Sequence, residues 1–239
     1  MTSKDIRGFL LTLIFSGERT IAACANAAYR DVQRALSGIG NMRDNDQDAY
    51  HKYRADIERF LVNSLESLPK PEKFDAWHRD TCMEIREKSD KHGIHKYVTW
   101  LKAEKEEPLF TYGLAQKWLN MTIKNMIVME NEEWNKHFES LKKVLHVPVD
   151  DNIMEAASDI GITIPRKKGE PGEYPNYDSK PWSRWNEADY SGFQGKLRCV
   201  VGEKYQLTPM EWEFPAWCEI AAKRESKNGN RYIEQDSNS

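Results

Sequence analysis

Lys117 is the residue of this sequence best placed to act as a nucleophile. It lies in the segment from Tyr112 to Met121, where apolar residues recur every three or four positions and predict a helix with one apolar face. Lys117 stands at the edge of that face, and a lysine so placed can be partly desolvated, which favours the neutral amine. Because a neutral amine attacks electrophilic carbon, the sequence predicts a nucleophilic role for Lys117.

Asp150 is the second candidate for chemistry and lies 33 positions further along the chain. Pro148, with a valine on each side, predicts an extended approach to Asp150, which then stands at the N-cap of the next predicted helix. An N-cap carboxylate accepts hydrogen bonds from backbone N–H groups, which hold it ionised and in one place. Such a carboxylate is suited to face a developing positive charge, as in the cleavage of an N-glycosidic bond.

Gly113 comes at the start of the helix that carries Lys117 and permits a tight turn there. The first N–H groups of a helix have no partner within the helix, and they suit a phosphate group. We therefore predict that this turn contacts a phosphate group.

The two segments together resemble the catalytic parts of the helix-hairpin-helix DNA glycosylase superfamily. The hairpin of that family usually reads Leu-Pro-Gly-Val-Gly-x-Lys, followed by a small residue, and its aspartate lies in Pro-Val-Asp-x-His or a close variant. Gly113 and Lys117 match the first hairpin glycine and the lysine of the bifunctional members, and Pro148-Val149-Asp150 matches the aspartate motif. The resemblance covers residues 108–164.

The sequence departs from the family pattern at two hairpin positions. Tyr112 replaces the proline and Ala115 replaces the second glycine, which weakens the hairpin as a phosphate clamp. The interval of 33 residues between lysine and aspartate is longer than in the commonest members. It is nearest to that of the archaeal 8-oxoguanine DNA glycosylase branch, which carries an additional helical stretch at this place.

The resemblance implies that one nucleotide turns out of the DNA duplex, so that Lys117 and Asp150 act on its sugar. It also implies DNA contacts at Gly113 and Gln116 in the hairpin, and at Asn152, which stands where the family has a histidine. A late helix of the archaeal branch closes the base pocket with an aromatic side chain and an acid. The predicted base pocket comprises Met121, Trp182, Trp185, Gln194, Glu211, Trp212 and Glu213. We expect neither a metal nor a cofactor.

Two functions from different classes are consistent with these residues. The first is a DNA glycosylase, with or without AP-lyase activity, that excises a modified or oxidised base in DNA repair or in defence against phage. The second is a non-catalytic helical module that binds DNA or a protein. The base itself stays open: the resemblance indicates oxidised guanine, and a bulky modified cytosine of phage DNA is the alternative.

The composition is that of a folded protein, with 39% hydrophobic and 31% charged residues and eight tryptophans. The longest apolar run near the N-terminus, from Phe9 to Phe15, is too short to span a bilayer, and no secretory-signal pattern precedes it. We therefore expect a cytoplasmic monomer without a membrane partner. The net charge of −3 requires that DNA be held by a local basic surface, for which residues 163–185 are the candidate.

Helical periodicity dominates the chain and predicts an all-α fold, which the resemblance refines to a glycosylase-like arrangement of two helical subdomains that flank a cleft. Residues 1–239 are predicted to form a single helical unit, in which residues 1–70 and 165–239 make one subdomain and residues 71–164 the other. Helices are expected over about 3–36 with a break near 16–17, and over 50–65, 74–93, 97–108, 114–129, 134–145, 150–161, 185–201 and 211–223. A long loop is expected over 165–181, and a frayed tail from residue 225.

Overall fold

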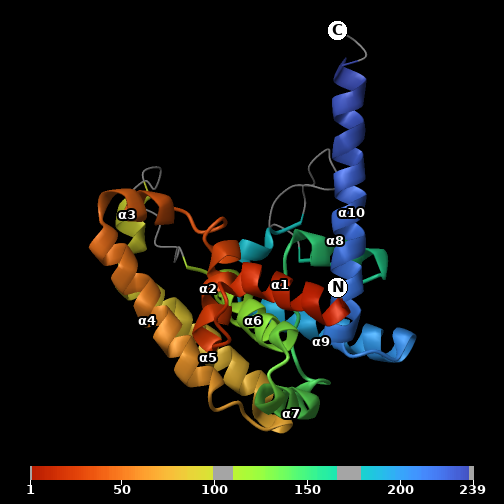
Figure 1. The fold of residues 1–239 in the computed structure, drawn as a ribbon, viewed down its shortest axis with the longest axis horizontal. Helices are drawn as coiled ribbons and strands as arrows, with labels where there is room; N and C mark the ends of the chain where they lie inside the picture. Colours follow the sequence, from red (N-terminus) through yellow and green to blue (C-terminus); the bar gives the residue numbers. More distant parts are fainter. Residues whose placement is uncertain (1, 99–109, 166–178, 237–239) are drawn as a thin grey trace.

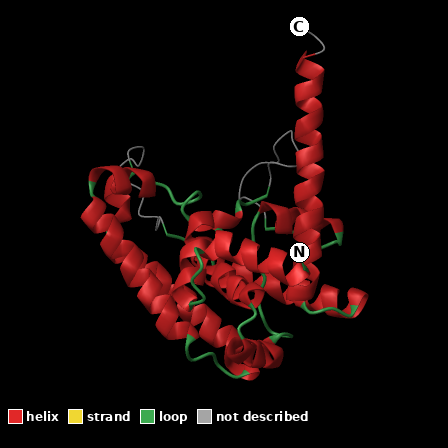
Figure 2. Cartoon of the chain, viewed as in Figure 1, coloured by secondary structure: helices red, strands yellow, loops and turns green. Residues whose placement is uncertain are grey.

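The computed structural model describes residues 2–98, 110–165 and 179–236, and within these ranges the chain is all-α (Figure 2). Three short 3-10 helices join the α-helices: η1 (Pro71–Lys73), η2 (Ile94–Tyr97) and η3 (Trp182–Arg184). The α-helices are α1 (Ser3–Phe15), α2 (Ile21–Val32), α3 (Ile39–Asn45), α4 (Gln47–Leu65), α5 (Phe74–Lys91), α6 (Tyr112–Met129), α7 (Glu132–Leu141), α8 (Asp151–Asp159), α9 (Glu187–Tyr205) and α10 (Pro209–Asp236).

Helix α6 lies at the centre of the molecule and carries the predicted nucleophile (Figure 1). It packs most extensively against α2, and also against α5, α7, α9 and η3. Helix α4 packs against α2 and α5, while α8 packs against α10. The C-terminal part of α10 projects away from the other helices in Figure 1. Because α6 has neighbours on several sides, its side chains are buried around most of its circumference, unlike those of a surface helix.

Local sequence explains where α6 begins and ends. The Thr111 hydroxyl accepts a hydrogen bond from the N–H of Leu114, which makes Thr111 the N-cap. At the other end, Glu130 takes a left-handed conformation with φ of 53° and ends the helix. Asn131 then caps α7 by accepting hydrogen bonds from the N–H groups of Glu133 and Trp134. The turn between α6 and α7 is therefore specified by two consecutive polar caps, Glu130 and Asn131.

The predicted all-α class is confirmed, and most predicted helices coincide with observed ones. The predicted break falls at Ser16 and Gly17, both with positive φ, between α1 and α2. Helix α3 was not predicted, because its seven residues follow the Gly38 turn and carry too short an apolar pattern. The prediction of a frayed tail is wrong up to Asp236, since α10 continues to that residue. The predicted helix over 97–108 and the loop over 165–181 lie largely outside the described residues.

The buried apolar side chains form one continuous cluster that extends from α1 to α10. Helix α6, expected in one subdomain, shares much of this core with α2, expected in the other. The division into two subdomains stays a prediction. None of the helices in the described ranges combines the length and the apolar character needed to cross a membrane.

Candidate active site

The structure brings the two predicted catalytic residues into direct contact. Nζ of Lys117, on the second turn of α6, donates a hydrogen bond of 2.8 Å to Oδ2 of Asp150, the N-cap of α8. Oδ1 of Asp150 accepts the N–H of Ile153 at 3.0 Å, as an N-cap does. The indole N–H of Trp217 on α10 donates to Oδ2 at 3.0 Å. Three helices therefore fix one carboxylate beside one amine.

The surroundings of Asp150 favour its ionised form. Burial by itself raises the pKa of this carboxyl, but the charge of Lys117 and the hydrogen bonds from Lys117, Ile153 and Trp217 outweigh it, and the pKa falls below its ordinary value. The Lys117 side chain is only 6% exposed, against 21% for Asp150. Lys117 also lies 5.9 Å from the centre of the Trp182 ring. The resting site is a shielded ammonium–carboxylate pair.

This pair lies in the wall of a cavity of about 740 Å³. A volume of that size is within the range of cavities that hold small organic ligands. The cavity is lined by residues of α2, α6, α8 and α10 and of the segment around η3. Four cationic and four anionic side chains contribute to the lining: Lys117, Lys124, Arg34, Arg224, Asp31, Asp150, Asp151 and Glu213.

A second lysine–carboxylate pair lies in the same cavity and was only half predicted. Nζ of Lys124, almost two turns after Lys117 on α6, is 2.6 Å from Oε1 of Glu213 on α10. The Glu213 side chain is 1% exposed, and its Oε2 has no hydrogen-bond partner within the described residues. Burial raises the pKa of Glu213 above its ordinary value, although the charge of Lys124 acts in the opposite direction. Because this oxygen is closed off from solvent, the Glu213 side chain must turn toward the cavity before the oxygen can accept a ligand donor.

Six predicted site residues line this one cavity, and four predicted pocket residues do not. Those in the lining are Lys117, Asp150, Asn152, Met121, Trp182 and Glu213. Trp185 and Trp212 do not line the cavity, because both are buried in the hydrophobic core. The Trp185 ring packs there against the ring of Phe193. The pocket placement is also corrected for Glu211, which caps the start of α10 by accepting the N–H of Thr208, and for Gln194, described below.

The prediction that Gly113 contacts a phosphate is also corrected, because protein covers the start of α6. The N–H of Gly113 donates to the carbonyl of Trp185 at 3.0 Å, and the Thr111 hydroxyl donates to the carbonyl of Ser183 at 2.5 Å. A Cβ atom at position 113 would lie 1.9 Å from the carbonyl oxygen of Trp182. Glycine is therefore required here for close approach of the η3 segment, which brings Trp182 into the cavity wall.

Gln116, predicted to bind DNA, instead holds the extended segment that leads to Asp150. This side chain is fully buried, and its Oε1 accepts the N–H of Val149 at 3.3 Å while its Nε2 donates to the Val149 carbonyl at 3.4 Å. Gln194 does the same for Val147, accepting its N–H at 3.2 Å and donating to its carbonyl at 2.8 Å. Two glutamines thus replace the strand partner that this segment lacks, and they position Asp150.

Gln116 and Gln194 form what we call the glutamine clamp. Asn120 donates a hydrogen bond of 3.1 Å to Oε1 of Gln116, and so links the clamp to a buried polar network that the sequence did not indicate. Its Nδ2 donates to the Tyr190 hydroxyl at 2.7 Å, and its Oδ1 is 2.8 Å from Nε2 of His78. His146 is 3.0 Å from the same hydroxyl and 2.9 Å from Oδ1 of Asp75. Burial lowers the pKa of both histidines, so that their rings are held neutral in the core. The network fixes Asn120 and, through it, the clamp.

Replacing Gln116 by leucine tests the clamp. We expect the free energy of unfolding to fall by about 2–4 kcal/mol, because the N–H and carbonyl of Val149 lose their buried partners. Urea unfolding measures this effect, with Gln47→Leu at an exposed position of α4 as the matched control. Equal stability of the two variants would contradict the clamp.

Comparisons with known proteins give no further guide to the function, because no family model, curated protein or solved structure matches the chain. Within the described ranges there is also no group of three histidine, cysteine or acidic side chains that would hold a metal ion. The geometry of the cavity and the resemblance of its two motifs are therefore the features that bear on function.

Proposed function

We propose that this protein is a DNA glycosylase that acts on a nucleotide extruded into the cavity of Lys117 and Asp150. The observation that carries the proposal is the 2.8 Å contact between these two side chains in the wall of a cavity of about 740 Å³. Sequence motifs that resemble those of the helix-hairpin-helix superfamily lie at both residues. An amine beside an ionised carboxylate is the pair of groups that N-glycosidic bond cleavage with a covalent intermediate needs.

The proposed reaction begins with the departure of the base. As the C1′–N bond breaks, its electron pair leaves with the base and the sugar becomes cationic, facing the Asp150 carboxylate. The proton that Lys117 donates to Asp150 passes on to the departing base, and the freed electron pair of the Lys117 amine forms a bond to C1′. Opening of the sugar ring at O4′, with transfer of a proton to that oxygen, gives a Schiff base. Transfer of a proton from C2′ to water then breaks the C3′–O3′ bond, and the strand is cut as the downstream phosphate leaves.

If Lys117 does not attack C1′, water does, and an abasic site is the product. Lys117 would then stabilise the departing base as a proton donor, while Asp150 would stabilise the cationic sugar and orient the water. The two variants of the reaction share every residue and differ only in whether the protein becomes covalently attached to DNA. Reduction with borohydride distinguishes them, because it traps a Schiff base and leaves an abasic site unattached.

Base recognition is assigned to the groups that line the cavity beyond the ion pair. Trp182 offers an aromatic face and Met121 a soft apolar surface, both suited to stack against a planar base. Oε2 of Glu213, without a partner among the described residues, would accept an N–H of the base. A base that presents an N–H donor to Glu213 is therefore preferred over a base that presents only acceptors to it.

Replacing Glu213 by glutamine tests this assignment. We expect kcat/KM for base release to fall by about tenfold or more, because one carboxylate acceptor becomes an amide with a donor of its own. Cleavage of a strand that already contains an abasic site needs no base recognition, so its rate should change little. Glu211→Gln, on the same helix but bonded to Thr208, is the matched control. An equal loss on both substrates would argue against a role in reading the base.

The alternative function is a non-catalytic helical module, and one observation favours it. The start of α6 is covered by the η3 segment, so the hairpin does not offer free N–H groups to a DNA phosphate. DNA would then have to be held by side chains at the rim of the cavity, where Arg34 and Arg224 are the cationic groups. Both arginines lie close to carboxylates, Asp31 and Glu155, which lowers the net attraction for DNA.

Release of a free base distinguishes the two functions. The protein is incubated with duplexes that contain 8-oxoguanine and with phage genomes that carry modified cytosines, and released bases are identified by mass spectrometry. A glycosylase releases a base and leaves an abasic site in one of these DNAs. A complete absence of both across the panel, with a protein that still binds the DNA, would overturn the proposal in favour of the binding module.

A further inference from the structure

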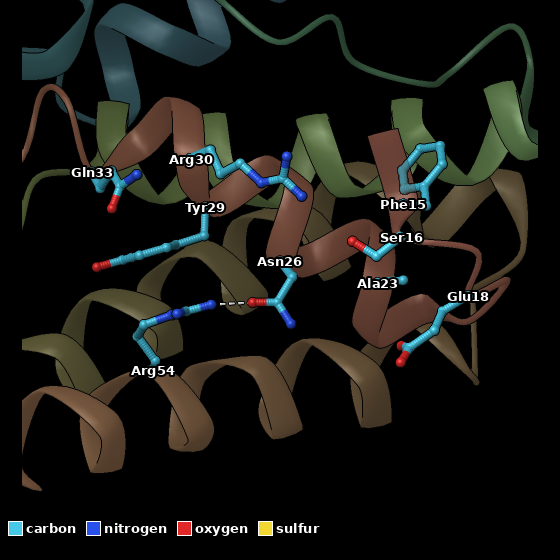
Figure 3. Close-up of a pocket in the computed structure, with 9 residues that line it drawn as sticks. All are labelled: Phe15, Ser16, Glu18, Ala23, Asn26, Tyr29, Arg30, Gln33 and Arg54. Carbon is cyan, nitrogen blue, oxygen red and sulfur yellow. Dashed lines mark hydrogen bonds between the residues drawn. The ribbon is translucent and has the colours of Figure 1, made fainter. Parts of the chain in front are cut away.

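A second cavity, of about 340 Å³, shares no lining residue with the proposed active site. Its lining comes from α2, from α4 and from the turn between α1 and α2 (Figure 3). None of its lining residues takes part in the chemistry proposed above. Two arginines, Arg30 and Arg54, contribute to its lining, with the hydroxyl of Ser16 and the amide of Asn26 beside them.

Arg54 is held in place by uncharged groups. Its guanidinium donates a hydrogen bond to Oδ1 of Asn26, lies 4.7 Å from the centre of the Tyr29 ring, and lies 5.8 Å from that of Tyr50. The residue is half-buried, and it forms no salt bridge with any residue that the structure describes. Contact with two aromatic rings fixes the plane of the guanidinium and leaves its remaining N–H groups for another acceptor.

Arg30 approaches the cavity from α2 and is likewise free of carboxylate partners within the described ranges. One of its terminal nitrogens donates to the carbonyl of Ile14 at 3.1 Å, near the C-terminal end of α1. Its other N–H groups stay available. Glu18 is the one acidic side chain in the lining, so the cavity has two cationic groups against one anionic group. The charges of the lining residues favour an anion, while Glu58, close to both Arg54 and Glu18, adds a second negative charge outside the lining.

We infer that this cavity binds a phosphate group. Two guanidiniums with spare N–H groups, together with the Ser16 hydroxyl and the Asn26 amide, offer more donors than the two oxygens of a carboxylate can use, while a phosphate has three or four oxygens. Arginine forks match the geometry of such a group and bind it through paired hydrogen bonds. The cavity is larger than a single phosphate, so part of the molecule that carries the phosphate also fits.

Two kinds of molecule carry such a phosphate: a DNA strand bound at the proposed active site, and a free phosphorylated small molecule. Arg30 lies on α2, and Arg34, four residues later and just beyond the end of that helix, lines the cavity of Lys117. A phosphodiester of a bound DNA strand could therefore reach the second cavity, and so could a free phosphorylated small molecule. The inference does not depend on glycosylase activity, because phosphate binding is measured by itself.

Side-chain NMR of the arginine Nε–H groups tests the inference directly. The full-length protein, labelled with ¹⁵N, is titrated with inorganic phosphate, thymidine 5′-monophosphate and a short single-stranded oligonucleotide. We expect the Arg30 and Arg54 resonances to shift, and the affinity to fall by about tenfold or more in Arg30→Gln/Arg54→Gln. Arg59→Gln, at an exposed position of α4 outside the cavity, should bind as the wild type does. Arg30→Gln alone keeps the test valid if the double variant does not fold.

The probes also separate the two sources. Tighter binding of the oligonucleotide than of the monophosphate, through the same two arginines, assigns the site to a DNA backbone phosphate. Tighter binding of the monophosphate assigns it to a free phosphorylated molecule. Unshifted resonances of Arg30 and Arg54 with all three probes would overturn the inference, and so would an affinity that the Arg30→Gln change leaves at the wild-type value. Both results are independent of base release, so they do not bear on the proposed glycosylase activity.

Discussion

Lys117→Gln is expected to abolish the borohydride-trapped adduct with DNA and to slow base release by about 10²–10⁴-fold. Glutamine keeps a polar side chain of similar reach beside Asp150 but has no basic amine to attack C1′. The effect should appear in kcat rather than in DNA binding, because the lost interaction is made with the reacting carbon. Gel electrophoresis of the reduced reaction measures the adduct, and single-turnover kinetics measure base release.

Lys124→Gln is the matched control, because Lys124 is the other lysine of the same cavity and is paired with Glu213 rather than with Asp150. We expect this variant to keep forming the adduct, with weaker binding of the substrate. Unfolding of each variant should be measured in parallel, since removal of either lysine leaves a buried carboxylate without its cationic partner. If the adduct still forms in Lys117→Gln and disappears in Lys124→Gln, then Lys124 is the nucleophile and the role proposed for Lys117 is wrong.

Asp150→Asn is expected to slow base release by about 10²–10⁴-fold as well, through loss of the charge that faces the cationic sugar. Asparagine is a good N-cap, so the hydrogen bond from the N–H of Ile153 is kept and α8 should stay formed. Lys117 loses its anionic partner, and we expect unfolding to become easier by about 3 kcal/mol near neutral pH. An active Asp150→Asn enzyme would contradict the proposed role of the carboxylate.

The pH dependence of this stability difference has a definite sign. Because Lys117 and the hydrogen bonds hold the pKa of Asp150 below its ordinary value, the native state keeps the carboxylate ionised at pH values where the unfolded chain takes up a proton. The contribution of Asp150 is therefore fully present above about pH 4, the ordinary range for aspartate, and is lost as the pH falls through the lower native pKa. The difference between wild type and Asp150→Asn should shrink below about pH 4.

Much of the helical architecture could be predicted from the sequence because it is specified locally. Ser16 and Gly17 end α1, Thr111 caps α6, and Asp150 caps α8, and each of these signals lies within a few residues of the helix end that it determines. The proximity of Lys117 and Asp150 was predicted from two motifs whose spacing resembles that of one family. Local patterns of this kind survive in a sequence read without any structure.

The parts of the site that were missed depend on contacts between distant segments. Lys124 and Glu213 are 89 positions apart, and Trp217 reaches Asp150 across 67 positions, so no local pattern indicates either contact. Gln116 was predicted to bind DNA because it follows a turn that resembles a phosphate-binding hairpin. Its burial results from the η3 segment and the extended segment before Asp150, which close around the start of α6. Sequence spacing showed which residues are near the chemistry but not which of them face the cavity.

In the proposed reaction, the amine of Lys117, held beside Asp150, becomes attached to C1′ of an extruded nucleotide. Peptide mapping by mass spectrometry tests it most directly: the protein is incubated with a DNA from which it releases a base, the mixture is reduced with borohydride, and the digested peptides are searched for a sugar remnant. Our account predicts the remnant on the peptide that contains Lys117. A remnant on Lys124 or on the terminal amine would contradict this, and base release without any remnant would assign the attack on C1′ to water instead of Lys117.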